Sequence, residues 1–303
     1  MGVPPTNAHV FAEALGLRAN RTLIMGVLNV TPDSFSDGGV HATVDAAVDG
    51  ARRMIEDGAD ILDIGGESTR PATFHDNKPL DPDEERARVV PVIEAIRREF
   101  PHVPISIDTY KADVARAALD AGATIVNDVS GLTSDSPFPG GERGSSMTRL
   151  VAERGCPIVI MHILGRPRDI PSKPEYADVV QSIVKFFRRQ VDYARREGVA
   201  EGNIILDPGI GFGKTSSHNL EILRRLREIV DLGYPVLVGA SRKRFLGKIL
   251  GVDDPLDRVE GTAATVALSI AAGASIVRVH DVRQMARVAK VSDAIVRGWK
   301  EDE

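Results

Sequence analysis

The sequence of 303 residues is poor in cysteine, with Cys156 as its single thiol. One thiol cannot form an intramolecular disulfide, and no Cys/His cluster has the spacing of a zinc site. These absences exclude disulfide-stapled folds and zinc modules. Cys156, which precedes Pro157, is expected to be a small buried residue.

Long apolar runs and an excess of basic residues are also missing. No stretch of about 18 apolar residues occurs, and the first 20 residues contain no signal-peptide core. The 38 basic and 43 acidic residues give a formal net charge of −5, so nucleic acid is not an expected partner. We therefore expect a soluble, cytoplasmic protein without a membrane partner.

Eight short apolar runs recur along the chain, and a longer amphipathic segment follows each of them. The runs do not alternate between apolar and polar residues, which indicates strands buried on both faces, as in parallel sheets. The predicted strands are Thr22–Val30, Asp60–Ile64, Pro104–Thr109, Thr124–Val129, Pro157–Ile163, Asn203–Asp207, Pro235–Gly239 and Ser275–His280.

The segments between the runs are predicted to be helices, several of which end at a glycine. Glycine is typical of that position because it adopts the left-handed conformation without strain. Thr43 is predicted to cap the first helix, and two segments rich in proline or glycine, Ala72–Asp83 and Thr133–Ser146, are predicted to be loops. The predicted helices are Thr43–Asp57, Lys111–Ala121, Asp178–Glu197, Asn219–Leu232 and Thr262–Ala272.

Regular alternation of strand and helix implies a parallel sheet with right-handed crossovers. Eight such units favour a (β/α)₈ TIM barrel over an open doubly wound sheet. No Gly-x-Gly-x-x-Gly follows the first strand, which disfavours a dinucleotide-binding fold. We predict one barrel domain over residues 21–303, preceded by an N-terminal arm, residues 1–20.

Polar residues end all eight predicted strands, and TIM-barrel enzymes carry their chemistry at these ends. A helix cap or a rim residue explains any single one of them, and explains Asp63, Asp128 and Asp281 as well as a functional role does. An apolar strand that ends in a buried carboxylate requires a partner for that charge. The polar ends are Asn29, Asp63, Asp108, Asn127 with Asp128, His162, Asp207, Ser241–Lys243, and Arg278 with His280 and Asp281.

Three cationic or hydrogen-bonding residues near the last two strands predict an anion site. Arg278 and His280 are two residues apart and share a face, and Lys243 follows the seventh strand. Barrel phosphate sites often lie at the loops after strands seven and eight. A phosphate or diphosphate is favoured, and a carboxylate fits nearly as well. The segment from Gly209 to Lys214 lacks the spacing of a phosphate-binding loop.

The remaining polar ends predict a site for a flat heterocycle. Asp108, Asn127 and Asp207 supply carboxylate acceptors and an amide, which suit amino and imino ring edges. No Ser–His–Asp arrangement or cysteine nucleophile is evident, so covalent catalysis is not indicated.

Several segments resemble the signatures of the dihydropteroate synthase family and follow the family's order from about Leu23 to Val296. These segments are Gly26–Gly39, Asp63–Pro71, Ser106–Thr109, Asn127–Asp128, Met161–His162, Leu206–Lys214, Ser241–Lys243 and Arg278–Asp281. The resemblance implies a TIM barrel that joins a pterin methyl diphosphate to 4-aminobenzoate.

The resemblance also implies a role for individual residues. Asp108, Lys243 and Arg278 would be catalytic, and Asn29 would help to bind Mg²⁺. Residues that would bind the pterin diphosphate are Thr69, Asp108, Asn127, Met161, Asp207, Phe212, Gly239, Lys243, Arg278 and His280. Residues that would bind 4-aminobenzoate are Phe35, Arg70, Pro71, Ser241 and Arg244, the last through its backbone N–H. The family further implies a homodimer.

Two departures and two alternatives accompany the resemblance. Ala72 stands where the family commonly has glycine, and the segments 72–85 and 133–146 are longer than usual. One alternative is a methyltetrahydrofolate-dependent corrinoid methyltransferase, which Ser241–Lys243 and the Thr69–Arg70 segment argue against. The other is a paralogue that binds pterin without catalysing the condensation.

Overall fold

The structure is a computed structural model that describes residues 21–30, 39–67, 80–133, 146–165, 170–171 and 173–299. The predicted arm, residues 1–20, lies outside them. The strands are β1 (Leu23–Asn29), β2 (Ile61–Gly65), β3 (Ile105–Asp108), β4 (Ile125–Asp128), β5 (Ile158–Met161), β6 (Ile204–Asp207), β7 (Leu237–Val238) and β8 (Ile276–Val279). The helices are α2 (Gly39–Glu56), α3 (Pro82–Glu99), α4 (Ala112–Asp120), α5 (Ser146–Arg154), α6 (Val179–Arg196), α7 (Ser216–Arg224), α8 (Arg227–Val230), α9 (Arg244–Leu250), α10 (Val259–Ala271) and α11 (Val282–Arg297), with short 3₁₀ turns η2 (Glu201–Asn203) and η3 (Pro255–Arg258).

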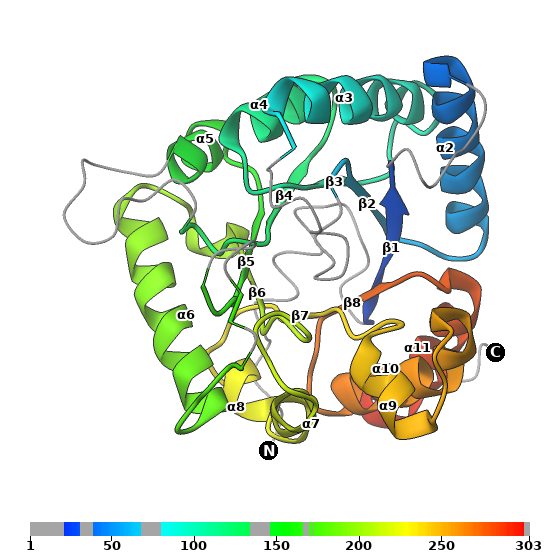
Figure 1. Cartoon of the computed structure of the whole chain (residues 1–303). Helices are drawn as coiled ribbons and strands as arrows, with labels where there is room; N and C mark the ends of the chain where they lie inside the picture. Colours follow the sequence, from blue (N-terminus) through cyan, green and yellow to red (C-terminus); the bar gives the residue numbers. More distant parts are fainter. Residues whose placement is uncertain are drawn as a thin grey trace.

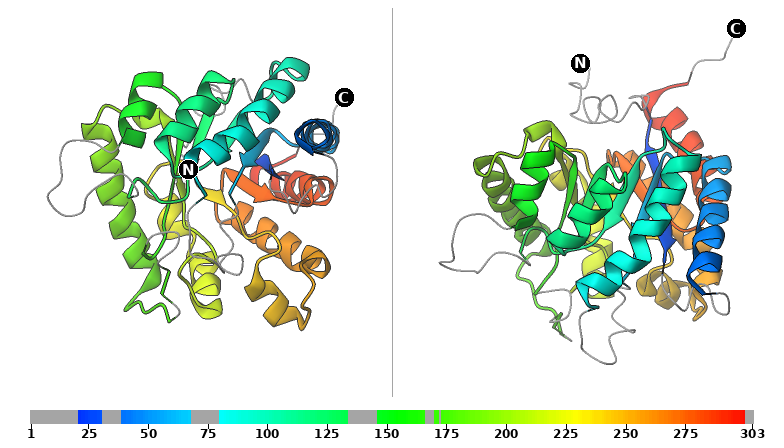
Figure 2. Two further views of the ribbon diagram at one scale, coloured as in Figure 1. Left: turned by 45° about the horizontal axis from the view of Figure 1, so that its top comes forward. Right: turned by 90° about the horizontal axis from the view of Figure 1, so that it is seen from above.

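All the strand pairs are parallel, in the order β6-β5-β4-β3-β2-β1-β8-β7. A parallel bridge between Leu206 and Val236 joins the two ends of this order and nearly closes the sheet. Helices surround the strands as an outer ring (Figures 1 and 2). The predicted (β/α)₈ barrel is confirmed.

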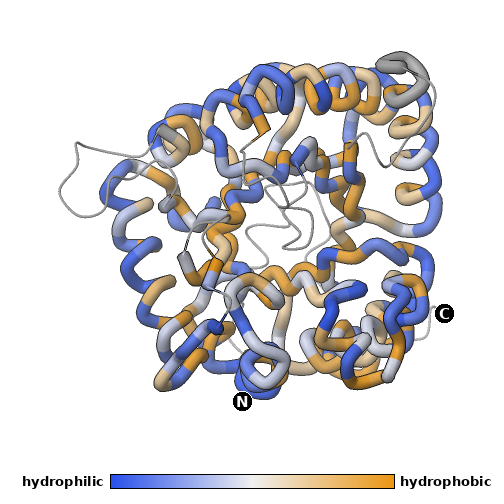
Figure 3. Tube along the Cα trace, in the orientation of Figure 1, coloured by the Kyte–Doolittle hydropathy of each residue, from blue (hydrophilic) through white to orange (hydrophobic). Residues whose placement is uncertain are grey.

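The strands are buried on both faces, which explains their continuous apolar sequences. One face fills the barrel interior, and the other packs against the surrounding helices, so the central strands are predominantly hydrophobic along the Cα trace (Figure 3). The interior cluster is Leu23, Met25, Ile61, Ile125, Val159, Ile205, Leu237 and Ile276. All eight predicted strands are confirmed, with ends within two residues of those predicted. Cys156 is buried and unpaired, as expected.

The predicted glycine terminators are confirmed. Gly58, Gly122, Gly198, Gly233 and Gly273 have φ values between 86° and 115°, a region that side chains with a Cβ rarely adopt. Each of them ends a helix and turns the chain into the next strand.

Several helices begin earlier than predicted, among them α10, which begins at Val259 and not at Thr262. Helix α2 begins at Gly39, so Thr43 lies inside the helix and is not its N-cap, because the apolar spacing of the helix sequence already begins at Val40, four residues before Val44. Helix α3 begins at Pro82, within the predicted loop, because Asp81 caps it and proline suits the first helical turn. The rest of that loop lies outside the described residues, except Leu80 and Asp81.

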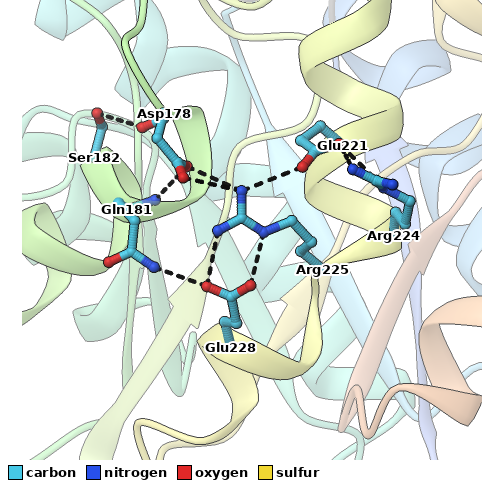
Figure 4. A network of polar contacts seen from close by, with 7 residues as sticks. All are labelled: Asp178, Gln181, Ser182, Glu221, Arg224, Arg225 and Glu228. Carbon is cyan, nitrogen blue, oxygen red and sulfur yellow. Dashed lines mark hydrogen bonds and ion pairs between the residues drawn. The ribbon is translucent and has the colours of Figure 1, made fainter.

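The predicted helix Asn219–Leu232 is two helices. It begins early because Thr215 and His218 form a capping box, and it divides after Arg224. At the division, Arg225 donates to the carboxylates of Asp178, Glu221 and Glu228 (Figure 4).

The Arg225 contacts tie the N-terminus of α6 to α7 and α8. Asp178 is also the N-cap of α6, where it accepts from the backbone N–H of Gln181. The network is partly exposed, so each ion pair contributes modestly, but three carboxylates around one guanidinium fix its geometry. It thereby fixes the helices that follow β5 and β6. Within the described residues, no helix is both long enough and apolar enough to span a bilayer.

Candidate active site

Five polar side chains from five strands face one another at the carboxyl end of the barrel interior. The strand register pairs Asp108 with Asn127, and Met161 with Asp207, which brings these residues to one level. The polar residues are Asp63 of β2, Asp108 of β3, Asn127 of β4, Asp207 of β6 and Arg278 of β8. The sequence predicted all five strand ends as polar, and the barrel closure brings them together.

Arg278 is the cation at the centre of this group. Its Nε donates to Asp63 Oδ2 at 2.6 Å, and its Nη2 donates to Asp108 Oδ2 at 2.7 Å. Its side chain is one-fifth exposed, whereas that of Asp63 is fully buried. Short, charge-assisted bonds to two carboxylates hold the guanidinium in one orientation. The ion pairs show that Asp63 belongs to the site and is not a rim residue.

Asp108 presents an acceptor that no described residue of the protein satisfies. Burial raises the pKa of Asp108 to about 7 and Asp63 adds to the increase, although Arg278 opposes it. Its Oδ1 is buried without a hydrogen-bond partner among the described residues, and so is Oδ1 of Asn127. Two adjacent buried acceptors without donors fit a ligand edge that carries N–H groups.

Asp207 is held by the loop that follows its own strand. The backbone N–H of Gly209 donates to Asp207 Oδ1 at 2.7 Å, and burial raises the pKa of Asp207 to about 6. Gly209 has a φ of 66°, and a Cβ at this position would lie 2.0 Å from the carbonyl oxygen of His162. The close contact between Gly209 and the His162 carbonyl therefore requires glycine, and it packs the loop after β6 against the end of β5.

Lys214 joins the same two segments, and it is not among the site residues predicted from the sequence. Its Nζ lies 3.0 Å from His162 Nδ1, 3.1 Å from the His162 carbonyl and 2.9 Å from the Phe212 carbonyl. Desolvation lowers the pKa of Lys214 to about 7, and burial lowers the pKa of His162 well below its usual value. The amine thus faces protein acceptors, which agrees with the absence of a phosphate-loop motif in this segment.

The other side of the site carries a lysine and an aromatic ring. Lys243 Nζ lies 4.2 Å from the centroid of the Phe212 ring, a cation–π distance. Phe212 packs in turn against a small cluster that includes Met161. Gly239 lies beside Arg278, since a Cβ there would come within 3.7 Å of the Arg278 Cβ. The predicted slot residues are therefore neighbours.

The predicted anion-binding residues after β7 and β8 contact one another. Ser241 Oγ lies 3.0 Å from His280 Nδ1 and accepts from the His280 backbone N–H at 3.2 Å. Arg242 pairs with Asp281, which gives Asp281 a structural role. Arg244 is the first residue of α9 and is exposed.

Comparison with known proteins agrees with this geometry. The model of the family described as "Pterin binding enzyme" matches residues 25–280. A dihydropteroate synthase of Synechocystis is 48% identical over 277 residues, which cover 91% of each protein. The chain belongs to the dihydropteroate synthase family.

Solved structures of the family superpose closely. A dihydropteroate synthase of Clostridium difficile, crystallised in the presence of pteroic acid, is 47% identical with a TM-score of 0.82 and covers 91% of this chain and 97% of its own. The enzyme of Xanthomonas albilineans with 4-aminobenzoic acid is 41% identical with a TM-score of 0.81, covering 91% and 93%.

Several predicted site residues fall in two family segments that the structure describes only in part. Phe35, Thr69, Arg70 and Pro71 lie outside the described residues, so their assignments remain predictions. Asn29 is described and lies half-buried at the carboxyl end of β1, beside Gly65.

A second charged cluster, missed in the sequence, lies where the second segment leaves β2. Lys111 Nζ is 2.7 Å from Glu67 Oε2 and also pairs with Glu85, which is almost fully buried. Glu67 Oε1 accepts from the backbone N–H of Leu80. The pairs join residues far apart in sequence, on the β2 end, α3 and the β3–α4 turn, so no local pattern reveals them.

Asp128 has a structural role. Its Oδ1 accepts from the backbone N–H and the hydroxyl of Ser130, and its Oδ2 accepts from the backbone N–H of Leu132, which has a φ of 66°. The carboxylate closes a tight turn after β4. Of the three ambiguous aspartates, Asp63 therefore lies in the site, and Asp128 and Asp281 stabilise its walls.

Proposed function

We propose that the protein is a dihydropteroate synthase, which condenses (7,8-dihydropterin-6-yl)methyl diphosphate with 4-aminobenzoate and releases 7,8-dihydropteroate and diphosphate. The observation that carries the proposal is a pair of buried acceptors, Asp108 Oδ1 and Asn127 Oδ1, which lie beside Arg278 in a barrel of this family and have no donor among the described residues. A pterin ring offers amino and imino donors to such an edge.

The pterin binds between the acceptors and the Lys243 side of the site. Asp108, Asn127 and Asp207 accept from the ring's N–H groups, and Lys243 donates to its oxygen and nitrogen acceptors. The lining residues are Met161, Phe212 and Gly239. The position of Lys243 over the Phe212 ring, the burial of Asn127 and Asp207, and the burial of Asp108 Oδ1 support these assignments.

The diphosphate binds at the ends of β8 and β7. Arg278 and His280 donate to its oxygens, and Thr69 is assigned to it from the family signature. Arg278 is already held by Asp63 and Asp108, so the guanidinium needs little reorganisation when the anion arrives.

Asn29 fits a Mg²⁺ ion that the diphosphate carries. Its carboxamide oxygen is a hard ligand, and no group of three His, Cys, Asp or Glu side chains within the described residues forms a protein cage. A Mg²⁺ ion held mainly by phosphate oxygens and water needs only one or two protein ligands. When bound, Mg²⁺ would neutralise part of the charge that develops on the leaving group.

4-Aminobenzoate binds on the side of the pterin methylene group. Ser241 and the backbone N–H of Arg244 are assigned to its carboxylate, and Phe35, Arg70 and Pro71 to its ring. Ser241 is buried at the end of β7 beside His280, which places its hydroxyl next to the proposed diphosphate residues.

The condensation breaks the C–O bond to the diphosphate and forms a C–N bond to the amine. The departing diphosphate takes the bonding electrons, and Arg278 and His280 stabilise its charge. The methylene carbon becomes cationic, with its charge delocalised into the pterin, where the Asp108 carboxylate stabilises it. The aromatic amine is unprotonated at neutral pH and attacks without a strong base. Its excess proton leaves to solvent or to the released diphosphate.

Purified protein mixed with both substrates and Mg²⁺ tests the proposal. Mass spectrometry should detect 7,8-dihydropteroate, and the Arg278→Met variant should form far less of it. Pterin binding without product would identify a non-catalytic pterin-binding paralogue and contradict the proposal.

A homodimer is proposed on the basis of exposed apolar side chains on α10 and α11, which pack side by side (Figure 1). Large apolar side chains are exposed there, with Ile295 at 79% and Leu268 at 64%. Exposed apolar patches are usually covered in an assembly. Sedimentation velocity should show a dimer that Ile295→Glu dissociates; a wild-type monomer at micromolar concentration would contradict the proposal.

The cytoplasmic location, the single-domain boundaries and the lack of a nucleic-acid partner stay predictions.

A further inference from the structure

A fully buried carboxylate lies immediately beneath the proposed pterin site. Asp63 is in the middle of β2, in register with Ser106 of β3, one level closer to the apolar interior than Asp108. A buried charge is unfavourable unless several partners satisfy it. The reaction as derived above does not need Asp63 to contact either substrate.

Asp63 contacts two residues that do belong to the site. Its Oδ2 accepts from Arg278 Nε at 2.6 Å and from Asn127 Nδ2 at 3.2 Å, and its Oδ1 lies 3.4 Å from the same Asn127 nitrogen. A carboxylate paired with a guanidinium is an acceptor only, so the Asn127 amide must turn its NH₂ group towards Asp63. The Asn127 oxygen therefore points away from Asp63, where it is buried without a partner among the described residues.

Building on the proposed function, we propose that Asp63 is a positioning residue that fixes the orientation of the Asn127 carboxamide and so makes the floor of the site select ring N–H donors. An amide can turn by half a rotation without changing its shape, and this exchanges an acceptor for a donor. Asp63 removes that freedom. Neighbouring Asp108 Oδ1 is also an acceptor without a donor in the part of the chain that the structure describes, so β3 and β4 both present acceptors to the ring.

Two double-mutant cycles separate this role from a simple charge partnership with Arg278. The ligand is 6-hydroxymethylpterin, which has no diphosphate, so the phosphate contacts of Arg278 do not enter. Calorimetry measures its Kd for Asp63→Leu alone, in an Asn127→Ala background and in an Arg278→Met background. Ser106→Ala is the matched control. Ser106 is as buried as Asp63 and is its register partner on β3, but its side chain makes no hydrogen bond to Asn127 among the described residues.

The proposal predicts that Asp63→Leu, which has no acceptor to hold the Asn127 amide, weakens pterin binding by about 10- to 100-fold, the loss expected for a mismatched buried hydrogen bond. In the Asn127→Ala background the same change should alter Kd less than about threefold, and in the Arg278→Met background it should keep most of its effect. Ser106→Ala should leave Kd nearly unchanged. The opposite pattern, an effect that survives in Asn127→Ala and vanishes in Arg278→Met, would overturn the proposal.

Neutron diffraction of the deuterium-exchanged wild-type protein tests the inference without any substitution. It should show both deuterons of Asn127 Nδ2 on the side of Asp63, and deuterons directed into the pocket would overturn the proposal. If the wild-type protein bound no pterin, the proposed function would fail, while the orientation of the amide would still be decided by this measurement.

Discussion

Asp207→Asn should abolish most of the affinity for the pterin while the barrel stays folded. In the native protein, Asp207 Oδ1 accepts from the backbone N–H of Gly209. In the variant, that N–H still needs an acceptor, so the amide oxygen should take the place of Oδ1. The new NH₂ group would then occupy the position of Oδ2 and meet the ring's N–H edge as donor against donor.

The size of the effect follows from the lost contact. A hydrogen bond to a charged group contributes about 1.5–3 kcal/mol, and every 1.4 kcal/mol is about tenfold in Kd, so affinity should fall roughly 10- to 150-fold. The free energy of unfolding of the variant should be higher than that of the wild-type protein at pH 7.5. Burial raises the pKa of Asp207 to about 6. At pH values between the ordinary aspartate pKa and this raised pKa, the folded protein therefore binds more protons than the unfolded chain. Stability therefore falls as pH rises through this window, and the neutral asparagine avoids that loss, up to about 3 kcal/mol.

Calorimetry at pH 7.5 and thermal unfolding at pH 4 to 7.5 measure the two effects. Asp192→Asn, on the exposed face of α6, is the matched control and should change neither. The reasoning is refuted if Asp207→Asn folds and binds the pterin as tightly as the wild-type protein. It is also refuted if the variant melts well below the wild type at pH 7.5, because the carboxylate would then stabilise the barrel.

Three further predictions follow from the same site. Pterin affinity should fall as the pH drops below about 7, because Asp108 and Asp207 take up protons and lose acceptors, and calorimetry giving a constant Kd from pH 5 to 8 would contradict this. Asn29→Ala should raise the Mg²⁺ concentration needed for half-maximal turnover, and a rate that EDTA does not change would remove the metal from the account. Lys214→Met should lower the free energy of unfolding by about 1–3 kcal/mol in a denaturant titration, because two carbonyls and a ring nitrogen lose their donor, whereas exposed Lys173→Met should have no effect.

Local sequence patterns predicted the barrel well because each unit carries its own signal. The eight apolar runs and the terminal glycines are short-range features that sterics and burial impose on each strand and helix end. The predicted cap at Thr43 and the predicted end of the loop at Asp83 were wrong, because helix α2 begins four residues before Thr43 and the Asp81 cap starts helix α3 at Pro82.

The site was predicted as a set of strand ends, but its internal contacts were not. Closure of the barrel pairs Arg278 with Asp63, 215 residues away in sequence, and no spacing rule anticipates such a pair. The ambiguity between Asp63 and Asp128 was resolved by their partners, a guanidinium in one case and turn N–H groups in the other. Lys214 was missed because a lysine after a glycine-rich stretch is expected to be solvated.

The most direct test of the account is the condensation reaction itself, run with purified protein, both substrates and Mg²⁺. Equal amounts of 7,8-dihydropteroate and diphosphate should form, and the formation of both should be largely lost in Arg278→Met. Diphosphate release that does not depend on 4-aminobenzoate, or no product despite tight pterin binding, would contradict it.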